Sequence, residues 1–304
     1  MTSIAMIEQT AGAGAARAAA RRLAKHHGGG ANRRPGWKTY TILGIVLAIS
    51  AYPIYYSFLL GSSDAGTIAR HPVPSLVPAQ HFIENAQRVF DSVAGFWTPL
   101  LNSTIIAVVT SVSVVLFSTL AGYSFSKLRF RGRSQLLVFV IATMAVPTQL
   151  GVVPLFIVMA KLGWTGSLAA VIVPGMVTAF GVFWMTQYLE SALPYELIEA
   201  ARVDGCSMIQ TFWHIALPAA RPAAAMLALF TFVGSWTQFF WPFIVLGSST
   251  PTLPIAIQLL SATYFADYSL ILAGVTLATA PLVIVFVFAG RHLVSGIMQG
   301  AVKG

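Results

Sequence analysis

Six long runs of apolar residues dominate the pattern of this sequence. Each run reaches the length of about 20 residues that a helix needs to cross a bilayer. The runs are continuously apolar and do not alternate with polar residues, which favours helices over membrane-spanning strands. We therefore expect an all-α integral membrane protein with six transmembrane helices, at Thr39–Leu60, Leu101–Ser126, Leu136–Val158, Leu168–Leu189, Ala223–Leu246 and Ser269–Gly290.

The charged residues lie between these runs, and none of the six runs contains Asp, Glu, Lys or Arg. If the segment before the first run is cytoplasmic, 15 of the 18 Lys and Arg residues lie inside. Cytoplasmic loops carry an excess of Lys and Arg, so this partition predicts cytoplasmic N- and C-termini. The net charge of +9 is then explained by topology, and we expect no nucleic-acid partner.

The composition agrees with a protein that lives in a lipid bilayer. Hydrophobic residues make up 57% of the 304 residues and charged residues only 9%, against roughly 25% charged residues in soluble domains. So few charges argue against a soluble enzyme, a disordered chain and a secreted disulfide scaffold. The single cysteine, Cys206, excludes an internal disulfide and a cysteine metal cluster, and we expect no metal site.

The segments outside the runs divide the chain further. Residues 1–38 are basic and rich in Ala and Gly, which predicts a disordered cytoplasmic tail before the helix at 39–60. Residues 61–97 form an extracytoplasmic segment in which Phe82, Ala86, Val89, Phe90, Val93 and Trp97 recur at helical spacing. This pattern predicts an amphipathic helix, either on the membrane surface or against a partner. Residues 98–290 hold the other five helices, and 291–304 form a cytoplasmic tail.

Two local patterns concern the second and third helices. Ser118 and Gly122 are small residues four apart, which suits close helix packing. Pro147 and Pro154 predict kinks in the third helix, because proline removes a backbone donor. Gln149 lies between the two prolines. It either faces a water-filled path or bonds to a neighbouring helix.

The loop Glu190–Pro222 between the fourth and fifth helices carries the most specific pattern. Pro194 can occupy the first turn of a helix, and Gly205 can end that helix in a left-handed conformation. Ser207 and Gln210 have the spacing of a capping box, which predicts a second helix that ends at Pro218. We expect two short cytoplasmic helices joined by a glycine elbow, with Ile198 and Ala201 on one side of the first.

This loop resembles the EAA loop of the permease subunits of ABC importers. The matching residues, which the resemblance implies dock on a separate ATPase together with Asp204, are Glu199, Ala200, Ala201, Gly205, Ile215, Leu217 and Pro218. The segments Pro154–Phe156, Gly234–Trp236, Trp241–Pro242 and Gly300–Gly304 are similar to the carbohydrate branch of that family, on the maltose-permease side. The resemblance runs from about residue 40 to the end, and Thr237 departs from it where the family often has Asn.

The resemblance implies a type I ABC-importer permease fold, with residues 98–290 as the permease core and 190–222 as the coupling loop. It also implies a bacterial inner-membrane location and several partners: a second, non-identical permease, an ATPase dimer and an extracytoplasmic sugar-binding protein. The sequence has no phosphate-binding G-x-x-x-x-G-K-[ST] loop. We therefore expect a transport subunit that binds no cofactor, with ATP and Mg bound by the partner ATPase.

A sugar site combines aromatic side chains with amide hydrogen bonds. The candidates for a solute pathway are Gln149, Trp236, Gln238, Phe239 and Trp241, although an aromatic belt at the membrane interface explains tryptophan equally well. The expected substrate is a cellobiose-like gluco-oligosaccharide, with a glycerol-phosphate diester as the other candidate in this branch.

The outer connection Gly247–Tyr268 contains Pro251 and Pro254, which stiffen it. In the maltose-type family the equivalent loop reaches into the binding protein. The resemblance therefore implies a small, mostly apolar tip that contacts the binding protein, formed by Thr252, Leu253, Pro254 and Ile255. The alternative is a simple connector between helices.

Two other function classes were weighed against a permease. An ion-coupled secondary transporter of a small neutral solute usually needs ionisable side chains within the membrane, and the six runs have no Asp, Glu, Lys or Arg. A membrane enzyme needs a catalytic motif. The runs contain no H-E-x-x-H, no G-x-S-x-G and no paired carboxylates. We expect no catalytic residues.

Overall fold

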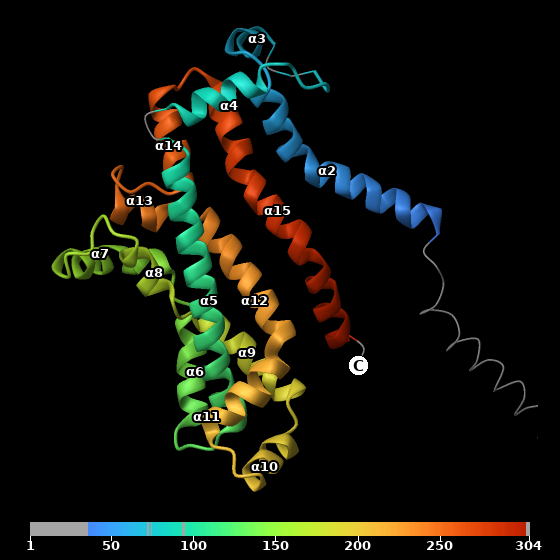
Figure 1. Cartoon of the computed structure of the whole chain (residues 1–304), viewed down its shortest axis with the longest axis vertical. Coiled ribbons are helices and arrows are strands. Elements are labelled where there is room, and N and C mark those ends of the chain that lie inside the picture. The colour runs from blue at the N-terminus through green and yellow to red at the C-terminus, as the bar shows by residue number, and fades with distance from the viewer. Residues whose placement is uncertain (1–35, 72, 74, 93–94, 302–304) are drawn as a thin grey trace, which may run out of the picture. The chain divides into compact units, whose positions relative to one another are not determined.

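The structure, a computed structural model, describes residues 36–71, 73, 75–92 and 95–301, and every regular element within these residues is a helix (Figure 1). Most of the tail predicted at 1–38 lies outside the described residues. The helices are α2 (Trp37–Gly61), α3 (Ala65–Arg70), α4 (Phe82–Phe90), α5 (Trp97–Lys127), α6 (Arg133–Thr143), η1 (Thr148–Gly151), α7 (Val152–Lys161), α8 (Ala169–Gly175), α9 (Ala179–Ala192), α10 (Tyr195–Val203), α11 (Met208–Thr211), η2 (Phe212–Ala216), α12 (Leu217–Thr237), α13 (Phe240–Leu246), α14 (Leu253–Thr263) and α15 (Tyr268–Ala301).

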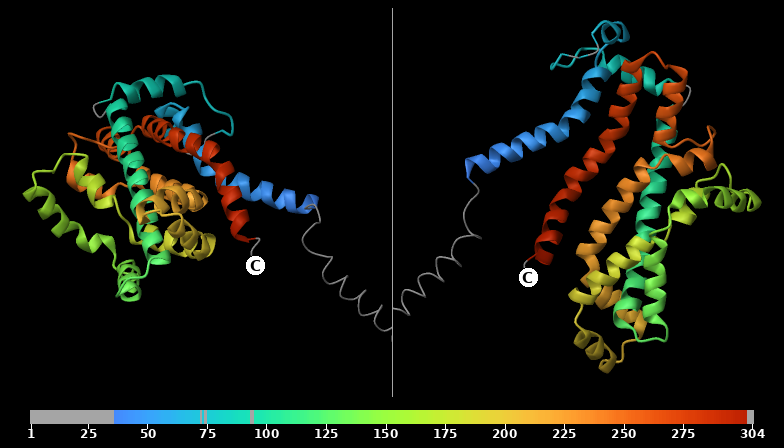
Figure 2. Two further views of the ribbon diagram at one scale, coloured as in Figure 1. Left: turned by 60° about the horizontal axis from the view of Figure 1, so that its bottom comes forward. Right: turned by 180° about the vertical axis from the view of Figure 1, so that it is seen from behind.

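The chain divides into two units between Tyr55 and Tyr56, so that α2 crosses the boundary. Within the described part of the first unit, α2 is an apolar helix that begins at Trp37 and contains Pro53. The second unit is a helical bundle in which α5 packs along α9 and α12. Figures 1 and 2 show α4 across one end of this bundle and α10 at the other.

The described residues contain five helices that are long and apolar enough to cross a membrane, or six if the bent pair α6 and η1–α7 is one span. This agrees with the predicted all-α membrane fold. The third span is not a continuous helix, because α6 and the η1–α7 segment are bent by 89°. The kink predicted there is confirmed at Pro147. No break occurs at Pro154, which lies in the first turn of α7.

Proline explains where two of the spans break. A proline ring clashes with the carbonyl four residues earlier and has no N–H to bond it. Pro147 therefore stops α6 at Thr143. Pro242 acts in the same way on Gln238, where the backbone is extended and α12 has ended. The prediction of one continuous fifth helix at Ala223–Leu246 is wrong for this reason.

Close packing at Gly122 joins α5 to α9. A Cβ atom at Gly122 would lie 2.7 Å from the Met185 backbone, so only glycine permits this approach. Ser118, one turn earlier, is fully buried. The close helix packing predicted from this pair is confirmed. It brings Met185 and Leu189 into a buried cluster with Val114 and Tyr123.

The predicted amphipathic helix is α4, whose bounds are Phe82–Phe90. Ala86 and Val89 are buried, and the helix packs on α15. Trp97, which the pattern placed on the same helix, instead begins α5. Arg88 donates to the Asp267 carboxylate at 2.6 Å and thereby ties α4 to the start of α15.

The connection between α13 and α15 is folded into the bundle. Leu253 and Ile255 are each only 1% exposed, and Thr252 is 4% exposed. In this structure these residues therefore do not project as a tip. They begin α14, a helix that the loop interpretation missed, and Pro254 lies in its first turn, half-buried. Leu253, Pro254 and Ile255 are apolar, which favours burial over projection.

Candidate functional site

The loop Glu190–Pro222 begins with α10, which follows Pro194 as predicted. Ile198 and Ala201 are 1% and 4% exposed and point into the bundle, so the predicted inward side of this helix is confirmed. Ile198 packs in the same cluster as Leu193 and Phe212. With this side of α10 buried, the opposite side is exposed to solvent and carries Glu199 and Ala200.

The elbow after α10 is a complete Schellman motif. Gly205 has φ +79°, a left-handed conformation that glycine adopts without steric cost. The Cys206 N–H donates to the Ala201 carbonyl at 2.9 Å, and the Gly205 N–H donates to the Arg202 carbonyl at 3.1 Å. Asp204 is exposed beside this turn. The glycine elbow predicted from sequence is confirmed.

The second limb of the loop starts with the predicted capping box. The Ser207 N–H donates to Gln210 Oε1 at 2.8 Å, and the Gln210 N–H donates to Ser207 Oγ at 3.3 Å. The prediction that this helix ends at Pro218 is wrong, because Pro218 lies in the first turn of α12, where its missing donor is tolerated. The limb continues through η2, a π-helical turn, directly into α12.

The remaining residues of the EAA pattern lie on this second limb. Ile215, Leu217 and Pro218 are half-buried, and Ile215 and Leu217 pack against the cluster that also holds Ile198. The tip of the loop therefore rests on a shared core. Around it lies an exposed apolar surface to which Leu197, Val203 and Ile209 contribute, at 48%, 87% and 70% exposure. An exposed apolar surface rimmed by charged side chains is typical of a docking site.

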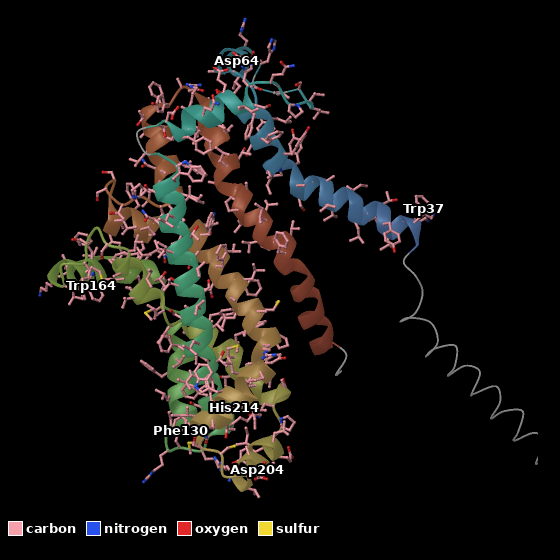
Figure 3. All side chains as sticks on the ribbon, viewed as in Figure 1. Trp37, Asp64, Phe130, Trp164, Asp204 and His214 are labelled. Carbon is pink, nitrogen blue, oxygen red and sulfur yellow. The ribbon has the colours of Figure 1, made fainter. Side chains whose placement is uncertain are left out.

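Three basic residues, at the end of α5, in the turn after it and at the start of α6, contact the start of this loop. Lys127 Nζ donates to the Glu190 carbonyl at 3.2 Å. The Arg133 guanidinium lies 3.8 Å from the Glu190 carboxylate. The Arg129 guanidinium lies over the Tyr195 ring, 5.4 Å from its centre. Figure 3 shows Phe130 of this turn at the same end of the bundle as Asp204.

The candidate pathway residues do not form one site. Trp236 and Trp241 are buried in different clusters, where their indole N–H groups donate to the carbonyls of Ala278 and Ala170 at 3.2 and 3.0 Å. The second bond has a clear cause, since Pro174 cannot donate to the Ala170 carbonyl four residues before it. Gln149 and Gln238 are exposed at the two helix breaks.

A groove of about 680 Å³ lies between the end of α12, α14 and α15. Trp236 and Phe239 line it, whereas Gln149, Gln238 and Trp241 do not. None of its lining residues is charged. Gln258, which the sequence did not single out, lines the groove, and its buried Oε1 atom has no hydrogen-bond donor among the described residues.

Two ionisable groups at the opposite end from the loop are perturbed. Burial acts to raise the pKa of Asp267, but hydrogen bonds from Ser269, Arg88 and the Leu270 N–H outweigh it and lower that pKa. Hydrogen bonds from Thr67 lower the pKa of the exposed Asp64, which caps α3. Within the described part of the chain, no cluster of three His, Cys, Asp or Glu residues offers a metal site.

The fold and the loop together define a class: a helical membrane protein with a compact, exposed loop of short helices between its fourth and fifth predicted spans. Residues 114–299 match the family described as the inner membrane component of binding-protein-dependent transport systems. The match spans more than half of the chain. The chain therefore belongs to this family and is an inner-membrane transport protein.

Similar proteins agree with this assignment. The arabinooligosaccharide permease AraQ of Halalkalibacterium halodurans is 32% identical over 88% of this chain and 96% of its own length. The lactose permease LacG of Rhizobium radiobacter is 31% identical over 89% and 97%. The sn-glycerol-3-phosphate permease UgpE of Yersinia pestis is 28% identical over 85% and 93%.

A solved structure shows the same fold. A chain of a bacterial ABC transporter involved in alginate import superposes with a TM-score of 0.71 over 86% of this chain and 99% of that chain, at 22% sequence identity. The expected permease fold is thus confirmed.

Proposed function

We propose that the chain is one permease subunit of an ATP-driven, binding-protein-dependent oligosaccharide importer, and that it forms half of the translocation pathway. The observation that carries this proposal is the loop Glu190–Pro222, in which an EAA helix keeps a buried side and an exposed face beside a rigid elbow. In this proposal an ATPase dimer docks on the loop and binds ATP and Mg. A second, non-identical permease and an extracytoplasmic sugar-binding protein complete the assembly.

The exposed face of α10 suits docking on such an ATPase. Ala200 is small and exposed, so a partner surface can approach the helix closely beside it. Glu199 can pair with a basic residue of the partner, and Leu197 and Val203 can enter an apolar groove. Glu199→Lys should therefore release the ATPase during purification. Asp91→Lys, the same charge reversal on an exposed residue beside α4, is the control and should retain it.

We propose that this loop and both termini are cytoplasmic, which the distribution of Lys and Arg supports. The topology is tested with single cysteines in a Cys206→Ser background. Ser249 and Ser134 are both exposed and lie on opposite sides in this proposal. A membrane-impermeant maleimide should label Ser249→Cys in intact cells and leave Ser134→Cys unlabelled. The reverse labelling would invert the topology.

The proposed substrate is a neutral gluco-oligosaccharide such as cellobiose. The sugar-transporting relatives support an oligosaccharide. The groove beside Trp236 and Phe239 supports a neutral solute, because its lining is mostly apolar, with a few hydroxyl and amide side chains and no charge. The relative named for sn-glycerol-3-phosphate makes a phosphate ester the alternative to exclude.

The deciding experiment reconstitutes the complex with its ATPase and binding protein and measures ATP hydrolysis across a panel of solutes. The panel comprises cellobiose, arabino-oligosaccharides, lactose and sn-glycerol-3-phosphate. We expect cellobiose to stimulate hydrolysis most. Stimulation by the phosphate ester alone would reject the sugar. Uptake driven by an ion gradient without ATP would reject the importer and favour a secondary transporter.

A further inference from the structure

Helix α5 differs from the other spans of the second unit in its continuity. The third, fourth and fifth predicted spans are each divided by a break, and α15 contains Pro281. In contrast, α5 runs unbroken from Trp97 to Lys127, and its one proline, Pro99, lies in the first turn. An unbroken helix resists bending better than one interrupted by proline or by non-helical residues. Thus, among the described spans of this unit, α5 alone has neither a break nor a proline beyond its first turn.

At one end, α5 is fastened to the start of the loop Glu190–Pro222. The Glu190 carbonyl lies four residues before Pro194, which has no N–H to donate, so the chain itself leaves this acceptor unpaired. Lys127, which is only 6% exposed, supplies the missing donor. Arg133 and Arg129 add the contacts to the Glu190 carboxylate and the Tyr195 ring.

The second limb of the same loop also rests on α5. Tyr123 and Phe212 are 2% and 3% exposed, and their rings lie 6.0 Å apart. Both limbs of the loop therefore meet the last turns of α5. A displacement of the loop at Glu190 or Phe212 cannot leave α5 in place without breaking one of these contacts.

At its other end, α5 is fastened to the connection between α13 and α14. Asn102 Nδ2 donates to the Pro251 carbonyl at 2.9 Å. The Leu253 N–H, the first donor of α14, bonds Ser103 Oγ at 2.9 Å. Thr252 precedes this helix but makes no side-chain cap, so Ser103 supplies the cap from α5. Asn102 and Ser103 are 7% and 2% exposed, which makes these bonds hard for water to replace.

We propose that α5 is the strut that couples the two ends of the permease. Lys127, the last residue of α5, is the positioning residue that holds it to the loop Glu190–Pro222, and Arg129 and Arg133, just after α5, support this contact. Asn102 and Ser103 are positioning residues that hold it to the outer connection. Asn102 and Lys127 lie about 37 Å apart along the helix, at 1.5 Å per residue, so one rigid element spans the bilayer. This inference rests on the proposed function for the partners that act at each end.

The first test measures coupling in the assembled transporter. Lys127→Met removes the ammonium donor and keeps the aliphatic stem, and Asn102→Leu removes the amide and keeps the volume. Each should lower the stimulation of ATP hydrolysis by loaded binding protein at least about fivefold, the lower range of coupling effects. ATPase co-purification and basal hydrolysis should not change. Lys127→Arg should restore the stimulation, because it restores the donor.

Matched controls separate coupling from general damage. Arg131 lies in the same basic turn, is exposed and makes no ion pair or ring contact with another described side chain, so Arg131→Met should have no effect. Thr104 lies beside Asn102 on α5 but bonds only the Leu100 carbonyl of its own helix, so Thr104→Val should also have none. The double variant of Lys127 and Asn102 should lower the stimulation of ATP hydrolysis no further than the more impaired single variant does, because both substitutions interrupt one strut. Multiplied effects would show two independent sites.

A second test needs no ATPase. Cys206, the single cysteine of the sequence, is exposed in the elbow and reports on the loop. In membranes from cells that express the permease without its ATPase, Asn102→Leu should shift the rate at which a hydrophilic maleimide labels Cys206, and Thr104→Val should not. An unchanged rate overturns the strut. A shifted rate in a chain that never binds an ATPase keeps the strut and rejects the proposed function.

Discussion

The loop Glu190–Pro222 and the connection Gly247–Tyr268 lie at opposite ends of the bundle. Each joins two helices of the bundle, but the loop projects from it and the connection is buried in it. The loop between α9 and α12 carries Glu196, Glu199, Arg202 and Asp204, all exposed, and projects from the bundle. The connection Gly247–Tyr268 has one charged residue, Asp267 near its end, and folds back into the core as α14. Burying an unpaired charged side chain is costly, so a segment with many charges projects into water and a segment with few can be buried.

The backbone bonds of these two segments differ as well. The loop satisfies its helix ends with its own residues, through the Schellman turn at Gly205 and the capping box of Ser207 and Gln210. The connection depends on other helices, with Ser103 and Asn102 of α5 capping or bonding it. A self-capped segment keeps its shape while it moves against a partner. A segment capped by its neighbours moves only with them.

The largest expected effect breaks the self-capped loop. Gly205→Asp places a side chain at φ +79°, at a cost of roughly 1 kcal/mol or more. We expect transport to fall to background while membrane insertion is retained. The measurement is solute uptake alongside the amount of protein in the membrane. Gly234→Ala, at a helical glycine with open space around it, is the control. Full transport by the Gly205 variant would show that the elbow is dispensable.

The next effect contrasts burial in the two segments. Leu253 is 1% exposed in the connection, and Leu197 is 48% exposed in the loop. Leu253→Ala should lower the free energy of unfolding by about 2–5 kcal/mol, whereas Leu197→Ala should change it by no more than about 0.5 kcal/mol. Thermal unfolding of the purified protein in detergent measures both. Equal losses would mean that the loop surface is as well packed as the connection.

A smaller effect compares the two helix starts. Ser207→Ala removes a capping box and should lower the free energy of unfolding by about 1 kcal/mol. Thr252→Ala, at the start of α14, removes a hydroxyl that makes no cap and whose oxygen is buried without a partner in the described residues. That variant should be neutral or stabilising. The same unfolding assay applies, and a destabilising Thr252 variant would reveal an overlooked bond.

The smallest effect concerns the charge that ends the connection. The pKa of Asp267 is lowered in the folded protein, so protons bind the unfolded chain more tightly than the folded one. Its contribution to stability is present above the ordinary carboxyl pKa of about 3.9 and is lost as the pH falls through the lowered value. Asp267→Asn should flatten the stability profile between about pH 5 and pH 3. An unchanged profile would assign the acid sensitivity to other groups.

Local rules predicted the docking loop well because its bonds are local. Gly205 and the Ser207–Gln210 pair each act within a few residues, and both adopt the expected conformations. The connection could not be predicted in this way. Prolines suggested a stiff tip, but its helix is capped by Ser103, which lies 150 residues earlier in the sequence. No short-range pattern reveals such a partner.

The breaks within the spans can be predicted from the sequence only in part. The expected kink at Pro147 follows from the clash with the carbonyl four residues earlier. The same rule applied to Pro242 indicates the break at Gln238, and applied to Pro194 it indicates that the Glu190 carbonyl needs a donor. It does not identify Lys127 as that donor, because the choice depends on how α5 packs beside α9.

The π-helical turn η2 has a consequence for the whole of α12. The Leu217 N–H bonds the Phe212 carbonyl five residues earlier, so this turn holds one residue more than an α-helical turn. One residue corresponds to a rotation of about 100° about the helix axis. The azimuth of every side chain from Leu217 to Thr237 is therefore set by that insertion. A π-helical turn inside the loop Glu190–Pro222 therefore determines which face of α12 packs against α5.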